Sequence, residues 1–358
     1  MYNRVVERPR AGEHYPASLG EMQVWFASDA ACLDYLEWLR WPDGFVCPSC
    51  GGAGGWRLGD GRWRCRACGS SGSVTAGTIF DRTRTPLTVW FAACWAFATA
   101  KDGVSALSLK RTLEIGSYQT AWAMLQRLRS VLVRPDRQKL AGRVEVDETY
   151  YGGKEAGLRG GRAPGKKALV GVAVEADDAG VLGRCRMGLL GDLSADSLVT
   201  FVTRHVEPGS LVVTDAWKGY LPIAKAGFAH EWRSQRAARK AGENLDALLP
   251  GVHRIASLFK RWLLGTHQGA VGSEHLQAYM DEFVFRFNRR RSRSRGMLFY
   301  RVLELAVRHE PVRYRDLIAD PRPRSTSPTP PTARGRPPSL ERPYPHRPWR
   351  KPQRDKYD

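Results

Sequence analysis

Residues 144–150 read Val-Glu-Val-Asp-Glu-Thr-Tyr, and this alternation of apolar and polar side chains predicts a β-strand with one buried face. The segments after it have the patterns of two more strands, a helix and two short strands, in that order: 168–174, 184–190, 194–206, 211–214 and 230–232. Helical periodicity returns at 252–264 and at 273–288. This succession of elements predicts a mixed α/β sheet with helical cover.

Two aspartates occupy special places in this pattern. Asp147 lies within the first strand, and Asp215 directly follows the apolar run 211–214. A carboxylate at the C-terminal end of a strand lies in the crevice where ligands bind to such sheets. Two such carboxylates can hold one or two Mg²⁺ ions, which polarise a phosphodiester and activate a water or a 3′-hydroxyl. Taken singly, each aspartate is better explained as a turn residue at a strand end.

The composition narrows the class of partner. The chain has 358 residues with 42% hydrophobic side chains, enough for two or three domains with cores of their own. Lys and Arg number 56 against 36 Asp and Glu, a formal net charge of +20. This charge indicates a polyanionic partner, most often nucleic acid, rather than a small-molecule substrate. The longest apolar run, 87–100, is too short for a membrane span, and the first residues lack a signal peptide's apolar core, so we expect a cytoplasmic protein with no membrane partner.

Four of the seven cysteines form two Cys-x2-Cys pairs that are separated by 14 residues: Cys47, Cys50, Cys65 and Cys68. They lie in a Gly-rich segment, 44–82, which is too poor in aliphatic side chains to fold on its own core. Each pair places two thiolates on one turn, and two turns complete a tetrahedron around Zn²⁺. A redox function does not explain two such pairs. The sequence therefore predicts a structural zinc ribbon, whereas Cys32, Cys94 and Cys185 lie in apolar patterns typical of buried thiols.

A helix is expected before the ribbon, at 18–41, within an N-terminal helical lead-in that spans 1–43. Ser18 and Glu21 have the spacing of a capping box, and the apolar stripe of the helix ends at Pro42. This lead-in is expected to pass directly into the zinc-binding segment.

A second helical region is expected after the ribbon, within 83–135, with helices at 87–100, 105–113 and 118–131. Two helices joined by a short Gly-containing turn are typical of a DNA-binding helix-turn-helix, although a plain three-helix bundle has the same outline. Ser117 and Gln119, at the start of the last helix, are candidates for contact with DNA bases.

Further basic segments suggest contact with the phosphate backbone. A Gly-rich loop at 152–165 suits such contact, although an ordinary solvated hairpin loop has the same composition. The run 286–295 contains six arginines. The candidate DNA-binding side chains of these two segments are Lys154, Arg159, Arg162, Arg286 and Arg289. The Pro- and Arg-rich tail, 319–358, is expected to be disordered, either as an aid to DNA affinity or as an extension without function.

Several blocks of the chain together resemble bacterial insertion-sequence transposases that have an N-terminal zinc ribbon and a catalytic domain of the DDE superfamily. The blocks are RWPDGFVCPSCG at 40–51, VDETYYGGK at 146–154, TDAWKGY at 214–220, and the helical segments 260–267 and 275–290. They occur in the family's order. The resemblance implies an RNase H-like catalytic domain over 140–300, in which Asp147 and Asp215 are metal ligands.

The chain departs from the family's common pattern at the third ligand. Many relatives carry Glu or Asn seven residues before a helix lysine, and that position, counted back from Lys260, is His253. Residues seven apart share a helix face, about 10.5 Å apart, so His253 can reach a metal while Lys260 holds a phosphate. The resemblance thus implies a DDHK site, and an imidazole ligand predicts that Mn²⁺ serves at least as well as Mg²⁺. Glu231, Glu243 and Glu282 are alternative third ligands, but none has the lysine spacing.

The resemblance implies a DNA transposase with structural zinc and catalytic Mg²⁺ or Mn²⁺. It would bind terminal inverted repeats, cut 3′ ends and join them to target DNA. We expect a homo-oligomer on double-stranded DNA, associated with the nucleoid, because two element ends must be held together. Two alternatives stay open: a zinc-ribbon DNA-binding regulator without catalysis, which leaves the aspartates unexplained, and an RNase H-like nuclease or resolvase that cuts without joining.

Overall fold

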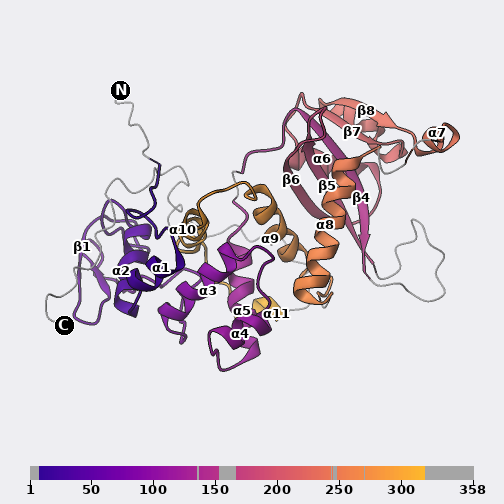
Figure 1. Ribbon diagram of the computed structural model, residues 1–358. Coiled ribbons are helices and arrows are strands. Elements are labelled where there is room, and N and C mark those ends of the chain that lie inside the picture. Colours follow the sequence, from indigo (N-terminus) through magenta and orange to yellow (C-terminus); the bar gives the residue numbers. More distant parts are fainter. Residues whose placement is uncertain are drawn as a thin grey trace. The chain divides into compact units, whose positions relative to one another are not determined.

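The computed structural model describes residues 8–134, 137–152, 167–242, 244, 248–269 and 271–318. The chain divides into two compact units: a first unit of Met1–Leu132 and Ser292–Asp358, and a second unit of Val133–Arg291 (Figure 1). The second unit is therefore inserted into the first. The expected tail at 319–358, and the expected basic loop from residue 153 to 165, lie outside the described residues.

The first unit begins with two short helices where the sequence predicts one. They are α1 (Leu19–Trp25) and α2 (Asp29–Arg40). Ser18 caps α1 by accepting a hydrogen bond from the amide of Glu21, as the capping-box spacing predicts. The prediction of one helix over 18–41 is wrong because Ser28 adopts an extended backbone and caps a new helix with its side chain.

The zinc-ribbon region forms a small antiparallel sheet in the order β1-β2-β3. Its strands are β1 (Gly55–Arg57), β2 (Trp63–Cys65) and β3 (Ser71–Gly72). The buried core of this sheet consists of Phe45, Cys47 and Cys65, with Trp41 and Trp63 packed against it. Such a core is too small to hold three strands by hydrophobic burial alone.

A helical core lies beside the ribbon in the same unit. The helix α3 (Leu87–Thr99) is buried on most of its circumference and packs on α2 and on α10 (Arg295–Ala306). Phe91 of α3 makes an edge contact with Phe26, with ring centroids 4.6 Å apart, and another with Phe299 of α10. The core of the first unit is therefore built from chain segments on both sides of the inserted unit.

The helices α4 (Ala106–Thr112) and α5 (Tyr118–Ser130) pack on each other, so the three helices expected after residue 86 are present. Ser105 and Ser117 cap them by accepting hydrogen bonds from Ser108 and Thr120. The short α11 (Tyr314–Ile318) contacts α5. None of the helices in the described ranges is long and apolar enough to cross a membrane.

The second unit is built on a five-stranded sheet in the order β6-β5-β4-β7-β8. Its strands are β4 (Arg143–Tyr151), β5 (Ala168–Ala176), β6 (Leu182–Leu190), β7 (Leu211–Asp215) and β8 (Ala229–Arg233). The pairs β4–β5 and β5–β6 are antiparallel, whereas β4–β7 and β7–β8 are parallel. This arrangement confirms the expected mixed sheet, and it makes β4 the central strand.

Helices cover both faces of this sheet. They are α6 (Ala195–His205) and the 3-10 helix η1 (Lys218–Ala226) on one face, and α8 (Pro250–His267) and α9 (Leu276–Asn288) on the other; α7 (Gln235–Lys240) follows β8. Val146 and Val212 point into the core under α6, and Val172 and Val213 into the core under α8. Figure 1 shows α8 alongside β4 and β5, which it contacts.

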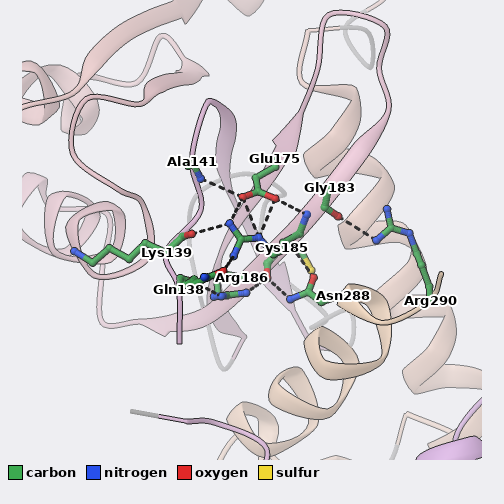
Figure 2. A network of polar contacts seen from close by, with 10 residues as sticks. Gln138, Lys139, Ala141, Glu175, Gly183, Cys185, Arg186, Asn288 and Arg290 are labelled. Atoms are coloured by element: carbon green, nitrogen blue, oxygen red, sulfur yellow. Dashed lines mark hydrogen bonds and ion pairs between the residues drawn. The ribbon is translucent and has the colours of Figure 1, made fainter. Parts of the chain in front are cut away.

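A polar network ties the first residues of the second unit to strands β5 and β6 (Figure 2). Glu175 accepts hydrogen bonds from the amide of Ala141 (3.1 Å) and from the guanidinium of Arg184 (2.6 Å). Arg184 also donates to the carbonyl of Lys139 (2.8 Å). The chain is thus held against the sheet immediately before β4 begins.

Residues at the end of α9 close the free edge of β6 in the same network (Figure 2). The side chain of Asn288 accepts a hydrogen bond from the amide of Cys185 (2.8 Å) and donates to its carbonyl (3.1 Å). Arg290 donates to the carbonyl of Gly183. A side-chain amide therefore pairs with the edge strand as a neighbouring strand would.

We predict that Asn288→Leu lowers the free energy of unfolding of the second unit by about 1–3 kcal/mol, because both backbone groups of Cys185 lose their partner. Urea denaturation followed by fluorescence measures the change. Gln277→Leu removes one bond to the edge strand, from the exposed amide of Leu189, and one to Asp281 Oδ1, and serves as the control on the same helix with a smaller loss, because water can replace the partner of an exposed amide. Equal losses in the two variants would contradict the role given to Asn288.

Candidate functional site

The four predicted zinc ligands lie together, and their sulfur atoms are all within 4.8 Å of one another. Cys47 and Cys68 have their Sγ atoms 3.7 Å apart, as do Cys50 and Cys65. The amide of Gly52 donates to Cys50 Sγ and that of Ala67 to Cys65 Sγ, so that backbone N–H groups face the thiolates of both turns. Four sulfur donors in this arrangement fit tetrahedral Zn²⁺.

Hydrogen bonds from Ser70 lower the pKa of Cys68 to about 6, so this sulfur is a thiolate at neutral pH. Cys32, Cys94 and Cys185 are buried elsewhere, which confirms that they are structural thiols. Burial raises the pKa of Cys185 to about 12 and that of Cys32 to about 12. The sulfur chemistry of the described chain is thus concentrated in the ribbon.

We predict that chelation of zinc, or the substitution Cys47→Ser, unfolds the ribbon and leaves the helices intact, because the ribbon's own core is too small to fold alone. Elemental analysis should show loss of the metal, and limited proteolysis should show new cleavage between residues 44 and 72. Cys185→Ala, which removes a buried thiol in the other unit, should retain the metal. An unchanged proteolysis pattern after complete chelation would refute the prediction.

The two predicted catalytic aspartates lie on neighbouring parallel strands. The register of β4 and β7 pairs Val144 with Val212 and Glu145 with Val213, and its continuation sets Asp147 beside Asp215. Neighbouring strands are about 4.8 Å apart. The carboxylate of Asp215 lies near enough to contribute to the raised pKa of Asp147. The sheet therefore brings together two residues that are far apart in the sequence.

The line of paired residues that crosses the sheet from Asp147 to Asp215 continues into β8, where Asp215 pairs with Arg233. We call these three residues the aspartate row. Paired residues of parallel strands share one face of the sheet, so Asp147, Asp215 and Arg233 all point to the side of α8. Arg233 donates to Glu231 Oε1 (3.0 Å) and to the carbonyl of Leu248 (3.4 Å), close to the start of α8. The row thus holds two carboxylates and, at its outer end, one guanidinium.

Both aspartates are nearly buried, with exposed fractions of 9% for Asp147 and 7% for Asp215. Burial, followed by the nearby carboxylates of Glu148 and Asp215, raises the pKa of Asp147 to about 8. The amide of Glu148 donates to Asp147 Oδ1 (2.8 Å) and that of Trp217 to Asp215 Oδ1 (2.9 Å), which fixes both side chains. Two buried carboxylates with oxygen donors side by side suit a hard divalent cation, whose charge removes their repulsion.

The helix α8 is anchored to β4 on both sides of Asp147. Glu145, which is buried, accepts hydrogen bonds from the amides of Gly251 (2.8 Å) and Val252 (3.3 Å) in the first turn of α8. Lys260 donates to Thr149 Oγ1 (2.9 Å) further along. A Cβ atom at Gly251 would lie 2.8 Å from Glu145 Oε2, so this approach requires glycine.

His253 and Lys260 lie seven residues apart on α8. His253 lies between the two contacts that anchor the helix to β4, and Lys260 makes the second of these contacts. His253 is half-buried, and Lys260 is exposed at the level of Thr149. Among the described residues, the cysteine cluster is the group of three or more metal-ligand atoms within 4.8 Å of one another. His253 and the two aspartates are thus on facing elements, but their ligand atoms are farther apart than in a closed coordination shell.

The alternative third carboxylates lie in different surroundings. Glu231 is on the α8 side of β8 but forms an ion pair with Arg233 (3.0 Å). Glu282 is fully buried in α9 and pairs with Arg286 (2.7 Å). Glu243 lies outside the described residues.

The candidate DNA-binding side chains are spread over both units. Ser117 is engaged as the cap of α5, whereas Gln119 is exposed in its first turn. Arg286 is taken up by its buried ion pair, and Arg289 lies over the ring of Phe285 (4.0 Å). Three further candidates lie outside the described residues: Lys154, Arg159 and Arg162.

Sequence reasoning identified one contributor to this site only in part and missed another. The alternation of β4 places Glu145 on the strand face of Asp147, where it could support the site or pair with a lysine, but nothing in the sequence marked it as a partner of α8. Arg233 carries no motif, and it was missed; only period-2 alternation with Glu231 could have assigned it to a strand face.

We predict that Glu145→Ala lowers the free energy of unfolding of the second unit by about 2–3 kcal/mol, because two amides at the start of α8 lose a charged acceptor. Glu145→Gln keeps one acceptor oxygen and should lose less. Urea denaturation measures both, and Glu274→Ala, at an exposed position, is the control. A loss in Glu145→Ala no larger than in the control would show that the contact carries no stability.

Comparison with known proteins finds two matching domain families. Residues 139–288 match the ISXO2-like transposase domain, and residues 27–71 match the transposase zinc-ribbon domain. A curated relative is the "Uncharacterized protein in transposable element ISH50" of Halobacterium salinarum. It is 26% identical over 281 residues, which cover 73% of this chain and 91% of the relative. The matched regions contain the cysteine cluster and the aspartate row.

Proposed function

We propose that this chain is an insertion-sequence transposase that joins a zinc ribbon to an ISXO2-like transposase domain, and that it cuts the 3′ ends of its own element and joins them to target DNA. We propose an RNase H-like fold for the second unit, in keeping with its mixed sheet and helices on both faces. The proposal depends chiefly on one observation: Asp147 and Asp215 lie side by side on parallel strands, nearly buried and facing α8.

In this proposal Asp147 and Asp215 hold one or two divalent cations, Mg²⁺ or Mn²⁺, which supply Lewis-acid activation of the nucleophile and the phosphodiester. Positively charged side chains of the protein would hold the DNA strand around the metal ions. Lys260, oriented by Thr149, lies on the α8 side, and Arg233 lies at the other end of the row. A bound phosphodiester would meet positive charge on both flanks, and buried surroundings strengthen such contacts.

We propose His253 as the third ligand. It lies on the helix that Glu145 and Thr149 tie to β4, on the face that carries Lys260. To complete a metal shell, the imidazole of His253 would have to come closer to the two carboxylates than it lies in the structure. Imidazole suits Mn²⁺ better than Mg²⁺, which is a harder ion.

We further propose that the first unit recognises the element ends as double-stranded DNA. Its helices α4 and α5 have helix-turn-helix connectivity, and Tyr118 and Gln119 are exposed at the start of α5, where a recognition helix meets base edges. The formal net charge of +20 supports binding to the phosphate backbone. Joining two ends at one target requires at least two copies of the protein, so we propose a homo-oligomer on DNA, at the nucleoid.

We predict that the full chain, with DNA from the flanks of its gene and a supercoiled target plasmid, forms metal-dependent joined products. Asp147→Asn should reduce their rate by about a thousandfold or more, because loss of a metal ligand removes several kcal/mol of transition-state stabilisation. Asp178→Asn, which alters a fully exposed carboxylate of the same unit, is the matched control and should keep wild-type activity. His253→Ala should lose activity, and His253→Glu should shift the preference from Mn²⁺ towards Mg²⁺.

Other results of this experiment would support a different function. DNA that is cut but never joined would replace the transposase with a nuclease or resolvase. Tight binding without any metal-dependent product would favour a DNA-binding regulator. Full activity of His253→Ala would remove His253 from the site and leave the aspartates in place.

A further inference from the structure

The outward face of the zinc ribbon carries a tryptophan and an arginine directly opposite each other. The antiparallel register of β1 and β2 pairs Trp56 with Arg64, and β3 adds Ser71 beside Arg64. Trp56 is 49% exposed, and Arg64 and Ser71 are exposed as well. Cross-strand partners have Cβ atoms about 4.5–5.5 Å apart, so the indole and the guanidinium form one contiguous surface.

The inward face of the same sheet is different, because each long side chain there has a partner. Arg57 forms an ion pair with Asp34 (2.9 Å) of α2. Trp63 donates to Glu37 Oε2 (2.9 Å), and its ring stacks on Phe45 with centroids 5.0 Å apart. Trp63 therefore belongs to the core of the ribbon.

The side chains of Trp56 and Arg64, by contrast, make no hydrogen bond, ion pair or ring contact with any residue that the structure describes. The exposed half of the Trp56 side chain contributes nothing to the stability of a ribbon that has so small a core. The two strands are nevertheless held by the cysteine cluster at their ends, since Cys65 is both a cluster member and the last residue of β2. The ring is therefore presented on a rigid support, where binding costs little ordering entropy.

We propose that this outward face binds unpaired nucleotides of DNA, with Trp56 stacked on a base and Arg64 bound to a phosphate. The inference rests on the proposed function, which makes DNA the substrate. An indole stacks on any base, but only where the face of the base is free, and in an intact duplex the bases are stacked on one another. A guanidinium next to the ring supplies the charge that follows the backbone. DNA that is opened or cut at an element end exposes such bases.

The test measures the affinity of the full zinc-loaded chain for three labelled DNAs: a blunt duplex, the same duplex with a single-stranded extension, and the single strand alone. The wild-type protein should bind the two DNAs that contain unpaired bases more tightly than it binds the blunt duplex. Trp56→Ala should weaken binding to both by about tenfold and change binding to the blunt duplex by less than about twofold. Trp56→Phe, which keeps a stacking ring, should retain most of the affinity.

The arginine has a matched control within the same ribbon. Arg64→Gln should weaken binding to the extended duplex and reduce the salt dependence of binding by about one unit of slope, as expected for one lost phosphate contact. Arg57→Gln removes an equal charge from the inward face and should leave both quantities unchanged. Zinc content and thermal unfolding of every variant show whether the ribbon is intact. If Trp56→Ala loses zinc, Trp56→Phe and Arg64→Gln decide the question.

Three results would overturn the proposal. Trp56→Ala could leave all three affinities unchanged, or it could weaken the blunt duplex as much as the extended one. It could also alter self-association in sedimentation while DNA binding stays the same, which would make the face a contact between copies of the chain. A wild-type protein that binds none of the three DNAs would instead refute the proposed function, so the two failures are distinguishable.

Discussion

A buried carboxylate, Glu145, holds the second unit in register. Its Oε2 accepts hydrogen bonds from two amides in the first turn of α8 while its backbone belongs to the central strand, so helix and strand are joined at a point two residues from Asp147. Lys260 and Thr149 form a second junction on the other side of Asp147. Because a helix is rigid over this length, two junctions fix where its intervening side chains lie along β4. His253 lies between these two junctions on α8, so its place along β4 depends on them.

The aspartate row illustrates a conflict between stability and function. Two carboxylates on neighbouring strands repel each other, and their burial raises the pKa of Asp147 to about 8. A site selected for stability alone would hold apolar residues, as the same strands do at Val146 and Val213. This arrangement suits a divalent cation, and in the proposed function Arg233 and Lys260 would supply positive charge to a DNA strand at its two margins.

The ribbon depends on its cysteine cluster rather than on a hydrophobic core. Its strands have two or three residues each and enclose almost no apolar volume, so a metal held by the four cysteines would have to stabilise it in place of burial. A sheet stabilised in this way can expose side chains that a hydrophobic core would need inside. Trp63 of β2 packs in the ribbon core, whereas Trp56 of the neighbouring β1 is 49% exposed.

Features that depend on short stretches of chain could be predicted from the sequence. The zinc cluster followed from cysteine spacing, since both turns are local. The helices α3, α4 and α5 followed from their local helical patterns, β4 from alternation and β5 from an apolar run. Features that depend on which residues meet across the fold could not. The helix expected at 18–41 is two helices because the chain turns at Ser28 to pack Phe26 on Phe91. The partners of Glu145, the place of Arg233 beside Asp215 and the exposure of Trp56 depend on strand register, which brings together residues that no local pattern relates.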